Sequence, residues 1–153
     1  MGEARTDDPS FLRQDISHFC VFNTDLGVTL ATQVRVAGTS ADRRRGLTGI
    51  DELAAGAGIW IAPCEAIHTF GMRMPIDVIF LDGQFRVRKV LQSLAPRRIS
   101  VCLRACSVLE LEAGAAAHSG TKPGHLLVFQ PATEGYSSQT AQSISTSPTC
   151  RQS

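Results

Sequence analysis

The segment spanning residues 75–91, PIDVIFLDGQFRVRKVL, constrains the fold more than any other part of the chain. Two runs of β-branched and other apolar residues flank the dipeptide Asp82-Gly83, which is typical of a β-hairpin turn. The first run places Ile76, Val78 and Phe80 on one face and Asp77, Ile79 and Leu81 on the other. Both faces are apolar apart from Asp77, so we expect a strand that is covered on both sides. The second run loses its alternation near Lys89, where a β-bulge is expected.

Short strand-like runs recur along the rest of the chain, at residues 19–22, 28–36, 58–62, 107–112 and 125–129. Three short segments carry helical signals instead: residues 41–45, which Thr39 or Ser40 can cap, residues 51–55, and residues 113–120. Many short strands with two or three short helices predict an all-β or β-dominated fold, built as a sandwich or barrel.

The chain has 153 residues, which suits one ordinary domain. Residues 1–15 are polar and residues 131–153 are rich in Ser, Thr and Gln. We therefore expect a disordered leader and a disordered tail around a single β-rich domain at residues 16–130. No apolar run approaches the roughly 20 residues of a membrane span, and the first residues lack a secretory apolar core. These features predict a soluble, cytoplasmic protein with no membrane partner.

Positive charge is concentrated in the middle of the chain. Residues 35–104 hold eleven Arg or Lys against six Asp or Glu, a local net charge of +5, whereas the whole chain has +1. A basic face attracts an anionic ligand or a nucleic acid. Only one Trp and one Tyr are present to stack on bases, so the composition favours a solvated basic face or a small anionic ligand over nucleic acid.

Five cysteines, an odd number in a chain of this length, favour reduced thiols that act as small core residues. A zinc site could draw on the following residues: Cys64, His68, Cys102, Cys106, His118 and His125. Their spacings match no established zinc pattern, so we expect neither a metal nor another cofactor. Cys64 and His68 could also form a nucleophilic pair, although no third group to orient them is evident.

Asp77 poses the main question about function. A buried carboxylate costs several kcal/mol unless it is paired or hydrogen-bonded. In a structural interpretation it accepts hydrogen bonds from backbone N–H groups or from Arg73. In a functional interpretation His68, Arg73 and Asp77 surround a pocket, and Arg45 is a distant partner. Glu110 alternates with two core leucines, and it points either to solvent or into a cleft beside Arg45 or Arg73.

Four ordered motifs resemble the family known as domain of unknown function 192. They are Arg43-Arg44-Arg45-Gly46-Leu47, the signature from His68 to Phe80, Leu109-Glu110-Leu111 with Gly114, and Gly124-His125. The resemblance spans about residues 25–129. Where the family has Gly-Asp near the end, this chain has Gly124-His125, which puts any role of that carboxylate in doubt. The resemblance implies a compact, jelly-roll-like β domain and implies no activity.

Three hypotheses about function remain open. The first is a small-ligand-binding or accessory module with a polar pocket lined by His68, Arg73, Asp77 and Glu110, with Arg45 nearby. Its ligand would be small and polar or anionic. The second is a hydrolase-type enzyme that uses His68 with Asp77 or Glu110. The third is a structural or protein-interaction domain, with no partner specified, in which the polar signature forms an internal ion-pair network.

Overall fold

The computed structural model describes residues 18–132 of the chain, and its described part is β-dominated, as predicted. The strands are β1 (His18–Asn23), β2 (Val28–Val36), β3 (Ala57–Ile61), β4 (Ala66–His68), β5 (Ile76–Leu81), β6 (Val87–Leu94), β7 (Ile99–Val101), β8 (Ser107–Glu112) and β9 (Leu127–Pro131). The helices are α1 (Ser40–Arg45) and α2 (Ala115–Ser119). The predicted leader and tail, residues 1–15 and 131–153, lie almost entirely outside the described residues. None of the described helices is long and apolar enough to cross a membrane.

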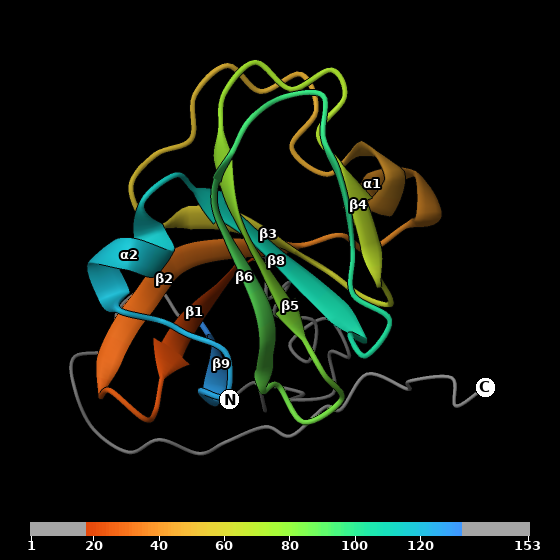
Figure 1. Ribbon diagram of the computed structural model, residues 1–153. Helices are drawn as coiled ribbons and strands as arrows, with labels where there is room; N and C mark the ends of the chain where they lie inside the picture. The colour runs from red at the N-terminus through yellow and green to blue at the C-terminus, as the bar shows by residue number, and fades with distance from the viewer. Residues whose placement is uncertain (1–17, 133–153) are drawn as a thin grey trace, which may run out of the picture.

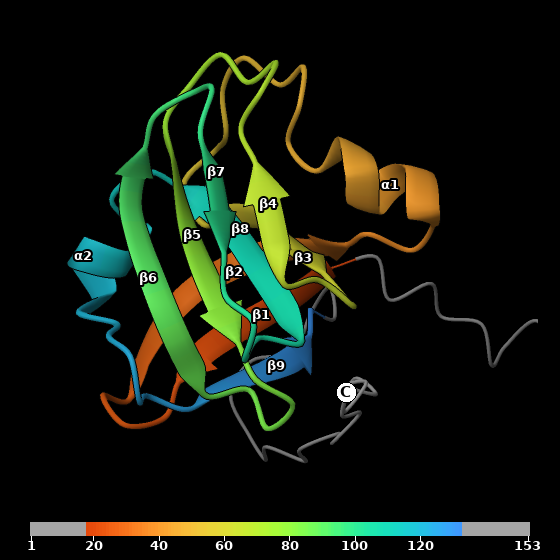
Figure 2. The ribbon, with the colours of Figure 1, turned by 45° about the vertical axis from the view of Figure 1, so that its right-hand side comes forward.

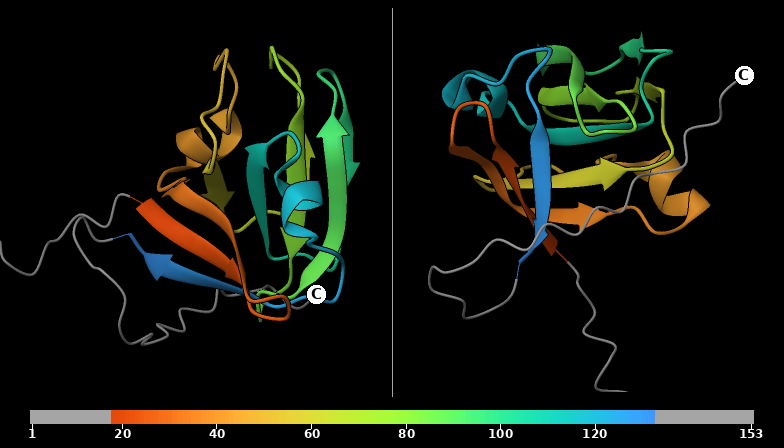
Figure 3. Two further views of the ribbon diagram at one scale, coloured as in Figure 1. Left: turned by 90° about the vertical axis from the view of Figure 1, so that its left-hand side faces the viewer. Right: turned by 90° about the horizontal axis from the view of Figure 1, so that it is seen from below.

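Seven strands form one sheet in the order β6-β5-β8-β3-β2-β1-β9 (Figure 1). The pair β2–β3 is parallel, and the other neighbouring strands of this sheet pair antiparallel. The sheet curls into a half-barrel, and Figure 3 shows β1, β2 and β9 diverging from β5, β6 and β8. A second sheet of two short strands, β4 and β7, covers part of its outer surface (Figure 2).

Aromatic contacts across the concave side explain the curl. Trp60 in the central strand β3 lies 4.9 Å, between ring centroids, from Phe129 of the edge strand β9. It lies 5.8 Å from Phe85, which precedes the opposite edge strand β6. One ring can contact both edges only when the sheet wraps around it. The burial of these rings contributes a large part of the hydrophobic stabilisation on this side.

Alternation along β5 divides the apolar residues between two cores, as predicted. Ile79 and Leu81 belong to the core on the concave side. The helix α2 also contacts β2 and β6. Ile76, Val78 and Phe80 belong to the outer core, beneath α1 and the small sheet. All six residues of β5 are buried, so the strand is covered on both faces.

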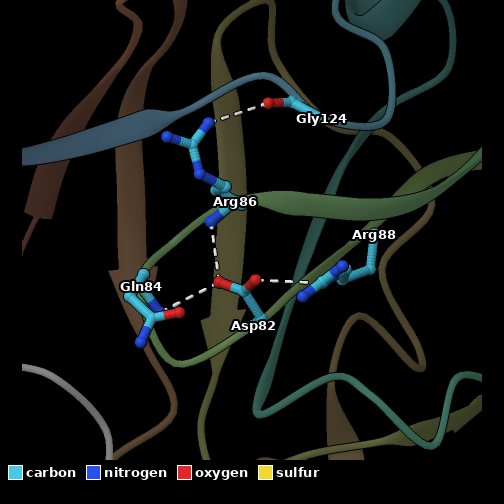
Figure 4. Close-up of polar contacts among 5 residues, drawn as sticks. All are labelled: Asp82, Gln84, Arg86, Arg88 and Gly124. Carbon is cyan, nitrogen blue, oxygen red and sulfur yellow. Dashed lines mark hydrogen bonds and ion pairs between the residues drawn. The ribbon is translucent and has the colours of Figure 1, made fainter.

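The turn between β5 and β6 is organised by Asp82 (Figure 4). One oxygen of its carboxylate accepts hydrogen bonds from the backbone N–H groups of Gln84 and Arg86, at 2.9 and 3.0 Å. The other oxygen pairs with Arg88 at 2.9 Å. The Arg86 side chain then donates to the carbonyl of Gly124 at 3.1 Å, just before β9. Arg86 also forms a β-bridge with Leu126, so the two edge strands meet and close the half-barrel at this end.

His125 takes a structural role in the same closure. Its Nδ1 accepts a hydrogen bond from the backbone N–H of Lys122 at 3.2 Å. The same atom lies 3.0 Å from Nδ2 of Asn23, a fully buried side chain that can only donate through that atom. Nδ1 therefore carries no proton, and the ring is the Nε2–H tautomer. Nδ1 of His125 therefore accepts hydrogen bonds, as a carboxylate oxygen of aspartate could. Gly124-His125 in place of the Gly-Asp motif thus still provides a hydrogen-bond acceptor at this position.

We expect His125→Ala to lower the free energy of unfolding by about 1–2 kcal/mol, because the buried amide group of Asn23 loses an acceptor. His125→Asp restores an acceptor at the same position and should stay close to the wild type. Urea denaturation of the three proteins measures the difference. Equal stability of the alanine and aspartate variants would show that the acceptor has no energetic role.

The helix α1 confirms its predicted caps. Thr39 is the N-cap and forms a capping box with Asp42, and Gly46 ends the helix. The predicted helix at residues 51–55 is wrong, because the segment is irregular, with a bend at its start and a turn at its end. Helix propensity is a weak local preference, and the contacts of this segment with the rest of the fold override it. Asp51 instead pairs with Arg73, and the carbonyl of Ala54 accepts from the N–H of Ala57 as β3 begins.

The predicted bulge in β6 is present, since the register with β5 shifts between Lys89 and Val87. A second shift lies between Leu94 and Leu91.

Cys20, Cys64 and Cys102 are free thiols, as expected. Cys106 is disulfide-bonded, so the expectation that every thiol is reduced is wrong at that position. Cys150 lies outside the described residues.

Candidate functional site

A pocket of about 190 Å³ lies on the outer side of the large sheet, between α1, β4 and β8. Figure 2 shows α1 beside β4, away from α2. The apolar wall of the pocket consists of Leu47, Ile61, Ala66, Ile67 and Met72. Its polar lining consists of Arg43, Arg44, Arg45, Thr48, Cys64, His68 and Glu110. Three of the five candidate residues from the sequence therefore meet here: Arg45, His68 and Glu110.

Strand register directs Glu110 into this pocket. Glu110 of β8 lies opposite Val78 of β5 and Ile59 of β3. Directly paired residues point to the same face of a sheet, so Glu110 shares the outer face with these two core residues. The neighbours Leu109 and Leu111 point to the concave core. Glu110 is therefore in a cleft, and the alternative of a solvated surface position is wrong.

The Glu110 carboxyl group is buried and only partly satisfied. Its exposed fraction is 3%, and the backbone N–H of Leu47 donates a hydrogen bond to it. Among the described residues, Oε2 has no hydrogen-bond partner. Burial raises the pKa of Glu110 to about 7, although the Leu47 hydrogen bond and the positive charge of Arg35 lower it. The group can thus accept a hydrogen bond when ionised and donate one when protonated, near neutral pH.

Gly46 allows the chain to approach this carboxyl group. It follows α1 with φ of +51°, a conformation that side chains disfavour. A Cβ atom here would lie 3.1 Å from Oε2 of Glu110. Nη2 of Arg35 donates to the Gly46 carbonyl at 3.1 Å and holds the turn in place. Gly46 and Leu47 of the Arg-x-x-Gly-Leu motif thus form one wall of the Glu110 site.

Cys64 and His68 lie on the opposite wall. Sγ of Cys64 donates to the carbonyl of Ala66 at 3.1 Å. Burial, together with the nearby carboxylates of Glu110 and Glu65, raises the pKa of this thiol. The thiol is therefore protonated at neutral pH and a poor nucleophile, which argues against a Cys64–His68 nucleophilic pair. His68 is exposed on β4, with its ring centroid 5.9 Å from that of Phe70.

The three arginines of α1 supply positive charge at the pocket. Arg43, Arg44 and Arg45 occupy the last turn of the helix, and all three contribute to the lining. Arg44 and Arg45 are exposed, whereas Arg43 is half-buried and donates to Oγ of Ser40 at 2.9 Å. The arrangement combines a buried carboxyl group, an apolar wall and guanidinium groups. Such a pocket suits a small molecule with a hydroxyl group at one end and a negative charge at the other.

Asp77 lies outside the pocket, on the opposite face of the sheet from Glu110. Its carboxylate is fully buried and accepts hydrogen bonds from the backbone N–H groups of Ser93 and Ala116, both at 2.8 Å. Ser93 lies in the second bulge of β6, with φ of +49°, and Ala116 is in the first turn of α2. These contacts match the structural interpretation of Asp77, in which backbone N–H groups donate to the carboxylate. Arg73 is not among the donors.

Arg73 is also absent from the pocket lining. Its side chain is 67% exposed and pairs with Asp51, whose side chain is 70% exposed. The chain turns at Gly71, with φ of +77°, between His68 and Arg73. Within the described residues, no group of three or more His, Cys, Asp or Glu side chains is placed to hold a metal ion.

Sequence reasoning missed several lining residues, chiefly Arg43, Arg44, Thr48 and Met72. The triple-arginine run was predicted as part of a family motif, with only Arg45 expected near the pocket. The available signal was its position directly before Gly46, which ends the helix and leads the chain into Leu47 on the pocket wall. No local signal predicted that this turn would face β4.

Comparisons with known proteins agree with this fold. The family model DUF192, described as Uncharacterized ACR, matches residues 21–129. A "putative transcription regulator" from Sinorhizobium meliloti 1021 has a TM-score of 0.65 at 22% identity, covering 72% of this chain and 91% of that one. A protein of unknown function from Novosphingobium aromaticivorans DSM 12444 has a TM-score of 0.63 at 25% identity, covering 71% and 81%. The comparison with curated proteins finds no match.

Proposed function

We propose that this chain, which belongs to the uncharacterised DUF192 family, is a binding module for a small polar ligand. The observation that carries the proposal is the unpartnered Oε2 of Glu110 in the pocket between α1, β4 and β8. A buried polar atom without a partner costs about 1–3 kcal/mol. A ligand that hydrogen-bonds to this atom removes that cost.

The pocket limits the chemistry of the ligand. A volume of about 190 Å³ accommodates a molecule the size of a short organic acid. Glu110, with its pKa raised by burial to about 7, suits a hydroxyl group, which both donates and accepts. The arginines at the end of α1 suit a carboxylate or phosphate group. A small hydroxy acid, or a short phosphorylated polyol, combines both groups.

A thermal-shift screen tests this proposal. Glycerate, tartrate and glycerol phosphate are the probes, and inorganic phosphate and ethylene glycol each present only one of the two groups. We expect a rise in melting temperature of several degrees with a probe that carries both groups, at concentrations far above its Kd.

Two matched variants locate the binding. Arg45→Ala changes a lining residue, and Arg73→Ala makes the same change in the signature but outside the pocket. The shift should shrink in Arg45→Ala and persist in Arg73→Ala. A shift that Arg73→Ala abolishes, or a complete lack of response to all three probes, would contradict the proposal.

Acid–base catalysis is the second candidate function, because a carboxyl group with a pKa of about 7 suits a general acid or base at neutral pH. Only Glu110 and His68 remain available for it, since Asp77 lies on the other face of the sheet. Chromogenic ester and phosphomonoester substrates test it. Turnover that disappears in Glu110→Gln would support a hydrolase, and turnover equal to that of Glu110→Gln would exclude this role for Glu110.

A further inference from the structure

The small sheet presents an exposed apolar face, which we call the β4–β7 face. Ala66 pairs with Val101 and His68 with Ile99, so these four side chains share one side of the sheet. The intervening pair, Ile67 and Ser100, is 7% and 8% exposed and points to the outer core. We define the β4–β7 face as Ala66, His68, Ile99 and Val101 together with Phe70 and Leu103, which follow β4 and β7 in the sequence; all six are exposed.

This face carries the two most exposed large apolar side chains among the described residues. Leu103 is 78% exposed and Ile99 is 68% exposed, and Phe70 and Val101 are close to half exposed. Isolated exposed apolar residues are ordinary, but a contiguous group marks an interaction site. Figure 2 shows β4 and β7 side by side at the front of the fold, with no helix over them.

Arginines flank the apolar residues on both sides in the sequence. Arg97 and Arg98 directly precede β7, and Arg104 directly follows Leu103; all three are exposed. Glu65 is the acidic residue next to β4, and no Asp or Glu occurs between residues 83 and 109. The partner of such a face must therefore offer both apolar surface and negative charge.

We propose that the β4–β7 face docks on an anionic membrane surface. In that position Leu103 and Ile99 enter the boundary of the acyl chains while the arginine guanidinium groups stay at the lipid phosphates. This peripheral contact needs no membrane-spanning segment. It departs from the expectation of no membrane partner, which rested on the lack of a long apolar run.

Other occupants fit the face less well. A second copy would bring two sets of three arginines together, and like charges across an interface cost free energy. A nucleic acid satisfies the arginines, but it offers no apolar partner for the aliphatic side chains at the centre of the face. An acidic protein remains the competitor, and the experiment separates it from a membrane.

The test is sedimentation of the full chain with lipid vesicles. We expect binding to phosphatidylcholine vesicles that contain about a third phosphatidylserine, little binding to pure phosphatidylcholine, and weaker binding as salt increases. The double variant Ile99→Ser/Leu103→Ser should reduce the partition coefficient roughly tenfold or more. The triple variant Arg97→Gln/Arg98→Gln/Arg104→Gln should reduce it by at least the same factor, because it removes three basic residues that are attracted to the anionic lipids.

A matched control makes the same chemical change elsewhere. Leu26→Ser/Val28→Ser alters two exposed aliphatic residues, Leu26 in the β1–β2 turn and Val28 at the start of β2, which are 44% and 36% exposed, and should bind vesicles like the wild type. Melting curves confirm that all variants fold. Equal binding to both vesicle types, unchanged binding by the Ile99/Leu103 variant, or no sedimentation of the wild type would overturn the proposal. In the last case an acidic protein becomes the occupant to test.

Discussion

Replacing Asp77 with asparagine is expected to lower the free energy of unfolding by about 2–4 kcal/mol. The carboxylate accepts one hydrogen bond from Ser93 N–H and another from Ala116 N–H, both at 2.8 Å. An asparagine side chain has one acceptor oxygen, so its NH₂ group must face the second backbone donor. That donor stays buried without a partner, and the remaining hydrogen bond loses its charge assistance. Urea denaturation measures the loss.

Asp51→Asn is the matched control for this variant. It makes the same chemical change in a carboxylate that is 70% exposed and pairs with an exposed arginine. Exposed ion pairs contribute about 0–1 kcal/mol, so its stability should stay near that of the wild type. If Asp77→Asn were no less stable than Asp51→Asn, the two backbone hydrogen bonds would not be holding the β6 bulge and α2 in place.

The contrast between Asp77 and Arg73 shows where local pattern predicts structure and where it fails. Period-two alternation placed Asp77 inside β5 and required a satisfied carboxylate, which depends only on the strand itself. The partners come from Ser93 and Ala116, which are distant in sequence, and no local pattern could name them. Arg73 was grouped with His68 because they are five residues apart, but a turn at Gly71 lies between them and Arg73 pairs with Asp51.

The small sheet illustrates a second limit. β4 and β7 have three residues each, which is too short for alternation to distinguish a strand from a loop. Their pairing, and with it the outward direction of His68 and Ile99, depends on contacts between segments about thirty residues apart. The direction of the Glu110 side chain could not be predicted from β8 alone, because α1 and β4, which cover this face of the large sheet, come from other parts of the chain. Such tertiary packing decides whether an alternating strand faces solvent or a pocket.

The wild-type protein is expected to lose about 3 kcal/mol of stability relative to Glu110→Gln as pH rises from 4.5 to 8. Glu110 has a pKa of about 7 in the folded protein, against an ordinary value of 4.5 for an exposed glutamate. Between these two values the folded protein keeps a proton that the unfolded chain has released. The stabilisation from the protonated group is therefore complete below pH 4.5, declines as pH rises, and is lost above pH 7.

Urea denaturation at several pH values measures this dependence, and the difference between the wild type and Glu110→Gln removes the contribution of other titrating groups. Glutamine stays neutral, so above pH 7 the variant should be the more stable protein. Glu65→Gln changes an exposed glutamate and should follow the wild-type curve. A bound hydroxy acid should reduce the pH dependence, because hydrogen bonds to the ionised carboxylate favour that form. A wild-type curve parallel to that of Glu110→Gln would mean that the pocket leaves Glu110 as well solvated as an exposed residue.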